Sequence, residues 1–371
     1  MAPNRHRPSH RGPLTPLASR LLVIGIVVLL IGGIAYVLLS GRSAPEVKNV
    51  TAPTIVPVTS STTTTLPPTT TLSPTTTTTD APLNTGPIYA VGVATYTLSE
   101  PGKYLCAPHG TDSGCIVRTM PLYVLFPAAG TPGTVVNGAM PDRSGGSYPL
   151  VVFGNGYLEN ALSYSVILDY WASRGYVVAA PQFPLSQVNS VGGPWEADIL
   201  NQPGDLSAAI SYMISQDSSS SSMLYKLIDP GEIAVAGQSD GADDALAVGY
   251  NTCCMDPRVK AVISLSGAEL SSFPGKYFTT QGPPLLIVQG TDDTINLPSD
   301  SQIAFDAARP PKYYLSLIGA DHLDGYQEVD GYSQAVQQVT GSFLDYYLKG
   351  RAGALGEMNK AGNVAGTDSL S

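Results

Sequence analysis

The sequence predicts an α/β fold with a mostly parallel central sheet and helices on both of its faces. Two observations lead to this prediction. Between about Pro87 and Lys349, short apolar runs alternate with segments of helical periodicity. Several of the runs are β-branched and apolar at successive positions, as expected of strands that are covered on both faces.

Seven apolar runs are the candidate strands, at residues 122–126, 150–153, 177–180, 233–236, 261–264, 285–289 and 314–317. Three helices are indicated by apolar residues that recur every three or four positions, over 164–171, 206–214 and about 333–348. The roughly 260 residues of this region are enough for one large domain with one core.

Three segments precede the domain, and a fourth follows it. Residues 1–20 carry four arginines, and residues 21–39 form an uncharged apolar run. At ~1.5 Å per residue, this run spans the hydrocarbon core of a bilayer, and we expect a transmembrane anchor in preference to a cleaved signal peptide. Residues 40–86 are rich in Thr and Pro, which predicts a disordered stalk, either a plain linker or an O-glycosylated one. The domain then occupies residues 87–350, and residues 351–371 are expected to be a flexible tail.

The distribution of charge gives the orientation. The arginines before the apolar run predict a cytoplasmic N-terminus and a single-pass protein whose domain lies outside the cytoplasm. The chain has a formal net charge of −10, and residues 1–42 contain five arginines and no acid, so the remainder is near −15 (−10 minus 5). A body this acidic repels phosphate, which excludes nucleic acid as a partner.

A nucleophile elbow is indicated by the segment GQSDG at residues 237–241. It follows the candidate strand at 233–236 and precedes ADDALAVGY, which we expect to be a helix. In such an elbow the serine occupies a sharp strand-to-helix turn, and the flanking glycines remove Cβ atoms that would collide with the strand and the helix. Ser239 is therefore the candidate nucleophile. An ordinary glycine-rich loop is the alternative.

A general base and an acid are needed to activate this serine. His6 and His10 precede the anchor, and His109 lies in a loop between two cysteines, which leaves His322, in GADHLDGY after a candidate strand, as the base. The strand LLIVQG ends in Thr-Asp-Asp, and we prefer Asp293 over Asp292 as the carboxylate that orients the imidazole. The resulting order in the chain is Ser239, Asp293, His322.

Two backbone N–H groups are the candidates for stabilising the oxyanion of a tetrahedral intermediate. One belongs to Asp240, immediately after the nucleophile. The other belongs to Tyr157, in the glycine-containing segment GNGY that follows the strand PLVVF. Asp243 and Asp244 lie in the first turn of the elbow helix, where we interpret them as favourable charges at a helix N-terminus.

Several of these segments resemble the cutinase-like polyester hydrolase, dienelactone hydrolase and platelet-activating-factor acetylhydrolase branches of the α/β-hydrolase superfamily. The resemblance extends from about Tyr123 to Lys349 through YVLFPA, YPLVVFGNGY, GYVVAAPQFP, GQSDG, RVKAVISLSG, LLIVQGTDD and FLDYYLKG. It implies an α/β-hydrolase fold, a Ser239–Asp293–His322 triad, Tyr157 and Asp240 around the oxyanion, and no cofactor. Asn155 and Gln238 depart from the residues common in relatives, and a serine nucleophile differs from the cysteine of dienelactone hydrolases.

The segment between the runs at 261–264 and 285–289 is short, so we expect no large cap over the site. An open cleft with Tyr157, Trp195 and Phe183 as apolar walls would suit small-molecule, lipid or polymeric esters. The leading hypothesis is a carboxylic ester hydrolase acting through an acyl-enzyme. The alternatives are an acyltransferase that uses cell-envelope acceptors and a non-catalytic surface-binding module.

The four cysteines all follow the predicted anchor, and an even number in an oxidising compartment favours disulfides. We expect Cys106 to pair with Cys115, which closes a short loop. A bridge between the adjacent residues Cys253 and Cys254 would be strained. No second cysteine–histidine cluster supplies ligands for a metal, and none is expected.

Overall fold

The computed structural model describes residues 88–106, 108–110 and 114–371. The predicted cytoplasmic segment, membrane anchor and stalk (residues 1–20, 21–39 and 40–86) lie outside these residues. Within the described ranges, no helix combines the length and the apolar character that crossing a membrane requires.

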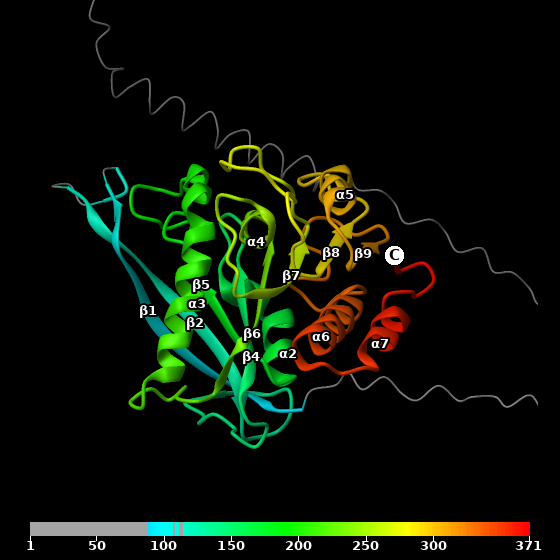
Figure 1. Ribbon diagram of the computed structural model, residues 1–371, viewed down its shortest axis with the longest axis horizontal. Coiled ribbons are helices and arrows are strands. Elements are labelled where there is room, and N and C mark those ends of the chain that lie inside the picture. Colours follow the sequence, from blue (N-terminus) through cyan, green and yellow to red (C-terminus); the bar gives the residue numbers. More distant parts are fainter. Residues whose placement is uncertain (1–87, 107, 111–113) are drawn as a thin grey trace, which may run out of the picture. The chain divides into compact units, whose positions relative to one another are not determined.

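A ten-stranded, mostly parallel mixed sheet forms the centre of the domain, in the order β10-β9-β8-β7-β6-β4-β5-β2-β1-β3 (Figure 1). All seven candidate strands are present, as β2 (Ile116–Ala128), β4 (Tyr148–Gly154), β5 (Val177–Pro181), β6 (Ile228–Gln238), β7 (Val259–Leu265), β8 (Leu285–Gly290) and β9 (Lys312–Leu317). The six from β4 to β9 are parallel to one another, whereas β2 pairs antiparallel with β5. The additional strands are β1 (Ala90–Leu105), β3 (Val135–Asn137) and β10 (Asp368–Leu370).

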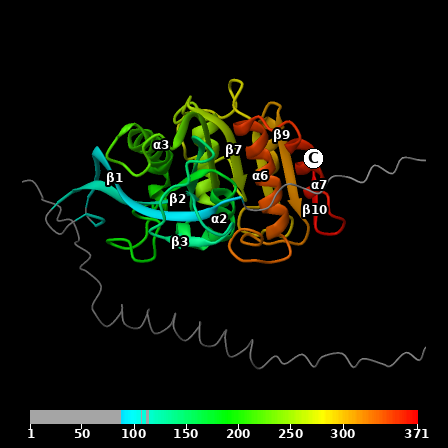
Figure 2. The same ribbon diagram turned by 90° about the horizontal axis from the view of Figure 1, so that it is seen from below.

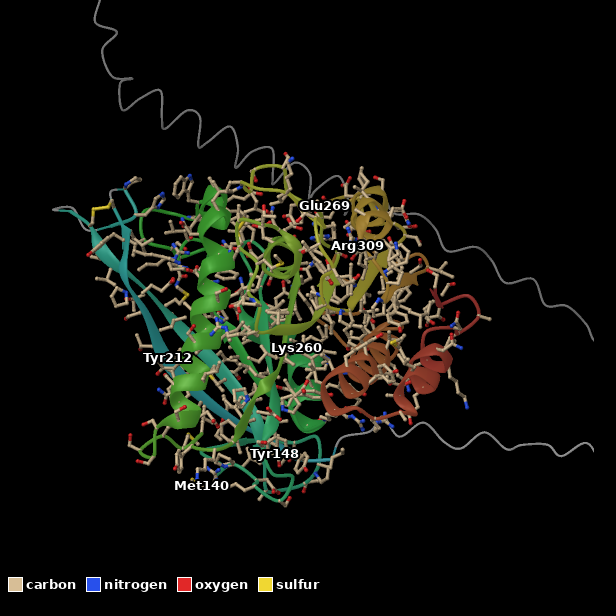
Figure 3. All side chains as sticks on the ribbon, viewed as in Figure 1. Met140, Tyr148, Tyr212, Lys260, Glu269 and Arg309 are labelled. Atoms are coloured by element: carbon tan, nitrogen blue, oxygen red, sulfur yellow. A yellow bond between two sulfur atoms is a disulfide. The ribbon has the colours of Figure 1, made fainter. Side chains whose placement is uncertain are left out.

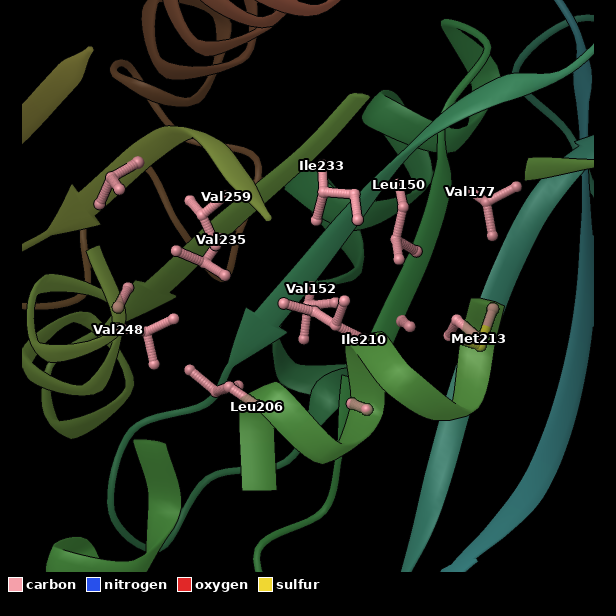
Figure 4. Close-up of a cluster of buried hydrophobic side chains, with 14 of the residues drawn as sticks. Leu150, Val152, Val177, Leu206, Ile210, Met213, Ile233, Val235, Val248 and Val259 are labelled. Carbon is pink, nitrogen blue, oxygen red and sulfur yellow. The ribbon is translucent and has the colours of Figure 1, made fainter. Parts of the chain in front are cut away.

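Helices cover both faces of the sheet, as predicted (Figure 2). One core cluster joins the sheet to α3 (Gln202–Ser218), α4 (Asp240–Tyr250) and α5 (Pro298–Ala307). The other joins it to α2 (Ser165–Ser173), α6 (Ser333–Lys349) and α7 (Ala354–Ala361). In Figure 4, Leu206, Ile210 and Met213 of α3 lie beside Leu150 and Val152 of β4, because the period of a helix places these three positions on one face.

The prediction of a flexible tail at residues 351–371 is wrong. These residues form α7 and β10, and β10 pairs antiparallel with β9. Ala354, Met358 and Ala361 are buried against α6 and the sheet, at positions one helical turn apart. Small residues gave this segment a weak apolar signal, yet they allow the helix to pack closely.

Both pairs of cysteines form disulfides. The bond between Cys106 and Cys115 joins the ends of β1 and β2 at the tip of their hairpin, where Figure 3 shows it in yellow. Cys253 and Cys254 are also bonded to each other, in the loop after α4.

The parallel strands determine where the chemistry can take place. Their carboxyl ends meet at one edge of the sheet, and the loops that follow β4, β6, β8 and β9 all begin there. Every residue that we predicted for catalysis lies in one of these loops or at the start of α4. Two short 3₁₀ helices near this edge, η1 (Ala161–Tyr164) and η2 (Glu196–Asn201), complete the described elements.

Candidate active site

Ser239 lies in the turn between β6 and α4 with φ 55° and ψ −125°, a conformation that side-chain-bearing residues rarely adopt. The neighbouring glycines explain how the turn fits. A Cβ on Gly237 would collide with the carbonyl oxygen of Gly241, and a Cβ on Gly241 would collide with that of Gly154. The chain therefore has the local geometry of a nucleophile elbow, with the serine at the carboxyl edge of the sheet.

The three candidate triad residues come together in one hydrogen-bonded row. His322 Nε2 lies 2.9 Å from Ser239 Oγ, and His322 Nδ1 lies 2.8 Å from Asp293 Oδ2. His322 is 7% exposed and Asp293 is 2% exposed, so water has little access to either contact. Residues separated by up to 83 positions thus lie in the arrangement that a nucleophile, a base and an acid need for proton transfer.

Asp293 is held by a set of donors that its neighbour Asp292 lacks. Its Oδ1 accepts the backbone N–H groups of Ile295 and Asn296 at 2.9 and 3.0 Å. Its Oδ2 accepts a hydrogen bond from Gln289 Nε2 at 3.0 Å, in addition to the contact with His322. Asp292 is exposed, and its carboxylate accepts only from Thr291 among the described residues. The carboxylate of Asp293 is consequently both fixed and aimed at the imidazole.

A second network, which the sequence did not reveal, joins the loops that carry these residues. Gln238 Nε2 donates to the backbone carbonyl of His322 at 3.0 Å, and Tyr164 OH donates to Gln238 Oε1 at 2.8 Å. Tyr164 OH in turn accepts the N–H of Gly156 at 3.1 Å. Gln238 therefore connects the histidine loop to the loop after β4. Its position beside Ser239 was the signal that could have suggested a supporting role.

The loop after β4 borders Ser239. A Cβ on Gly156 would lie 3.2 Å from Ser239 Cβ, and Asn155 Nδ2 donates to the carbonyls of Gly156 and Glu159. Among the described residues, the backbone N–H groups of Tyr157 and Asp240 have no hydrogen-bond acceptor. Both N–H groups are thus available to an oxygen of a substrate.

The expected apolar walls are present only in part. Phe183 is fully buried in the core and cannot line a cleft, because its position after β5 faces the helix layer of α3. Trp195 is 48% exposed and stacks on His109, with ring centroids 5.1 Å apart. His109 also places Nδ1 3.1 Å from the carbonyl of Val191, so it supports the loop before η2. Tyr157 is partly exposed.

The interpretation of Asp243 and Asp244 as favourable charges at the helix N-terminus is wrong, because both side chains are buried. Burial raises the pKa of each carboxyl group well above its usual value, and Asp243 Oδ1 accepts the N–H of Ala268 at 2.6 Å. Burial, and then the charge of Glu196, raises the pKa of Asp240 to about 7. The first turn of the elbow helix therefore favours neutral carboxyl groups next to Ser239.

Comparison with known families places part of the chain. Residues 128–272 match the chlorophyllase family. Chlorophyllases are carboxylic ester hydrolases of the α/β-hydrolase superfamily, and the chain is a carboxylic ester hydrolase. The matched segment extends from the end of β2 to beyond β7 and contains Ser239, but it ends before Asp293 and His322. No curated protein matches the chain.

Proposed function

We propose that this ester hydrolase works through an acyl-enzyme on Ser239, with His322 as general base and Asp293 as the acid that orients it. The hydrogen-bonded row from Ser239 Oγ through the imidazole to Asp293 Oδ2 supports this assignment most directly. In the first step, His322 Nε2 accepts the proton of Ser239 while Oγ attacks the ester carbonyl. The protonated imidazole then donates to the departing alcohol, and water releases the acid from Ser239 by the same route.

The negative oxygen of each tetrahedral intermediate accepts from the N–H groups of Tyr157 and Asp240 in this mechanism. Both groups are free of other acceptors in the described part of the chain, and both belong to loops at the same edge of the sheet. Asp293 keeps Nδ1 protonated and thereby leaves Nε2 unprotonated toward the serine. Transfer of the acyl group to another hydroxyl would use the same machinery with a different acceptor.

The name of the matching family points to chlorophyll-like esters. From this match we infer only that the substrate contains an ester bond. Exposed apolar side chains on the loops after β4 and β5 favour an ester with an apolar portion. They include Leu158, Leu162, Val188 and Trp195. We further propose that the domain acts outside the cytoplasm, tethered by residues 21–39, since both disulfides suit an oxidising compartment.

Labelling and mutation together test the mechanism. A fluorophosphonate should label Ser239, and the Ser239→Ala or His322→Ala change should each reduce kcat/KM for p-nitrophenyl esters by about 10³-fold or more. The double variant should be little worse than either single variant, because the residues act as one unit. Full activity of Ser239→Ala would refute the assignment. Adding sugar acceptors and identifying the products separates hydrolysis from acyl transfer.

Limited proteolysis of whole cells tests the proposed location. Protease added outside should release the domain by cutting between residues 51 and 87. A domain that stays protected until the cells are lysed would show that the orientation is wrong.

A further inference from the structure

A hollow with an uncharged lining lies between the sheet and the first turn of α5, on the face of the sheet that α5 covers. Gln289 of β8 and Ser316 of β9 are paired in register, and Tyr314 lies two residues before Ser316 on the same face of its strand. The beginning of α5 forms the opposite wall. The hollow has a volume of about 340 Å³, within the range of small-molecule sites.

The side chains that line this hollow are uncharged and rich in hydrogen-bonding groups. Four hydroxyl groups and two amides contribute, from Thr291, Ser299, Tyr314, Ser316, Gln289 and Gln302. Two other hollows contain charged side chains: one has Arg174 and Lys349, and the other has four acidic residues. An ion would find no opposite charge among the walls of the first hollow. The hydroxyl groups of a ligand could pair with Ser299 and Ser316, which are both at least partly exposed. The hydroxyl groups of Tyr314 and Thr291 also line the hollow, but they already form hydrogen bonds within the chain.

Gln289 connects this hollow to the candidate active site. Its Nε2 donates to Asp293 Oδ2 at 3.0 Å and to the carbonyl of Asn296 at 3.1 Å. Both acceptors fix the orientation of the amide, so Oε1 faces away from Asp293. This oxygen is buried and has no hydrogen-bond partner within the described residues. A residue that lines the hollow therefore also holds the triad carboxylate.

We propose that this hollow binds a small neutral ligand with several hydroxyl groups, of the chemical class of a monosaccharide or another polyol. Hydroxyl groups both donate and accept, which matches a wall of hydroxyls and amides without a net charge. The ligand is either a free polyol or the hydroxyl-rich alcohol part of an ester. In the second case, the proposal rests on the function proposed above.

Saturation-transfer NMR on the full-length chain tests the proposal with methyl α-D-glucopyranoside as the probe. We expect saturable transfer with millimolar affinity, which is ordinary for a ligand of this size in an open site. Methyl cyclohexyl ether, which lacks hydroxyl donors, and glucuronate, which is anionic, should each bind at least tenfold more weakly. Equal binding of all three, or no saturable binding of the glucoside, overturns the proposal.

Two tryptophan substitutions locate the binding. Ser299→Trp places a bulky side chain at the exposed mouth of the hollow and should weaken glucoside binding at least tenfold. Ser221→Trp, in an exposed loop outside the hollow, should leave binding unchanged. Undiminished binding to Ser299→Trp overturns the proposal. Ser239→Ala should bind the glucoside normally, so a failure of the triad assignment and a failure of this site are distinguishable.

Kinetic measurements distinguish a ligand that is part of the substrate from a free polyol. If they belong to the substrate, an acetyl ester of glucose should have a lower KM than cyclohexyl acetate, and Ser299→Trp should abolish the difference. If the ligand is instead a free polyol, the two KM values should be equal. Adding the polyol should then change kcat for p-nitrophenyl acetate, because the polyol contacts Gln289, which holds Asp293. An unchanged KM and an unchanged kcat in both experiments contradict a functional site.

Discussion

Asp292 and Asp293 are adjacent carboxylates with opposite surroundings, and this contrast gives a residue-level prediction. Asp293→Asn should reduce kcat/KM by about 10³-fold or more, because an amide cannot hold the imidazole in the required tautomer. Asp292→Asn is the matched control and should change kcat/KM by less than about threefold, since its side chain is exposed. Steady-state kinetics of the two purified variants is the measurement. A large loss in Asp292→Asn alone would move the acid to the neighbouring position.

Asp240 makes stability depend on pH in a direction that can be worked out. Its carboxyl pKa is about 7 in the folded chain, against 3.8 as the ordinary value, so between these values the folded state binds more protons than the unfolded state. The contribution of this group to the free energy of unfolding is fully present below about pH 4 and is lost as the pH rises toward 7. Above pH 7 the group causes no further change in stability. Burial also raises the pKa of Asp169, Asp243 and Asp244, which act in the same direction.

The Asp240→Asn variant should therefore show a flatter decline of unfolding free energy between pH 4 and 7, by up to about 1.4 kcal/mol per pH unit. Denaturant titrations at several pH values measure it. Asp292→Asn should retain the slope of the parent chain. A slope that is the same in all three proteins would show that Asp240 ionises normally in the folded state.

At the scale of elements, α7 provides a prediction that separates a packed helix from a loose tail. Met358 is 1% exposed and packs in the cluster that contains α6. Met358→Ala should lower the free energy of unfolding by about 2–4 kcal/mol, because it removes buried methylenes and leaves a cavity. Val364→Ala, at a residue that is 49% exposed, should cost less than about 0.5 kcal/mol. Urea unfolding of both variants measures these changes. Equally small effects in the two variants would contradict the packing of α7 and support a flexible tail.

The elements that could be predicted from the sequence are those whose signal is local. The seven strands that were predicted are marked by short, largely apolar runs, and α2, α3 and α6 carry clear helical periodicity. Strand β1 contains Gly92, Pro101 and Gly102 and alternates between buried and exposed positions, so no apolar run marks it. Strand β10 is an Asp-Ser-Leu triplet that exists only because β9 pairs with it.

The residues of the candidate site also divide into those that the sequence could predict and those that it could not. Ser239 could be identified from a motif in context, and His322 from the scarcity of histidines. Gln289 and Gln238 could not, since their contacts depend on how separate loops meet; Gln238 reaches a residue 84 positions away. Burial of Asp243 and Asp244 likewise depends on the loop after β7, which closes over the helix.

At the scale of the whole domain, the two outer strands of the sheet are β3 and β10, and each has only three residues. Removing residues 351–371 deletes β10 and exposes β9, a six-residue strand with the sequence KYYLSL. We expect the truncated chain to self-associate as its concentration rises, because β9 would present unpaired N–H and carbonyl groups. Light scattering over a concentration series measures this. Met358→Ala, which keeps β10, should stay monodisperse wherever the parent chain does, and a monodisperse truncated chain would contradict the prediction.

The short outer strands limit how readily copies of the domain associate when they are concentrated. A ten-stranded sheet that ended in long, straight strands would offer every copy of the chain a template for joining the next copy side by side. Because each edge strand has only three residues, two domains that meet edge to edge can form few backbone hydrogen bonds. Many copies of the domain can then reach a high local concentration and remain separate molecules.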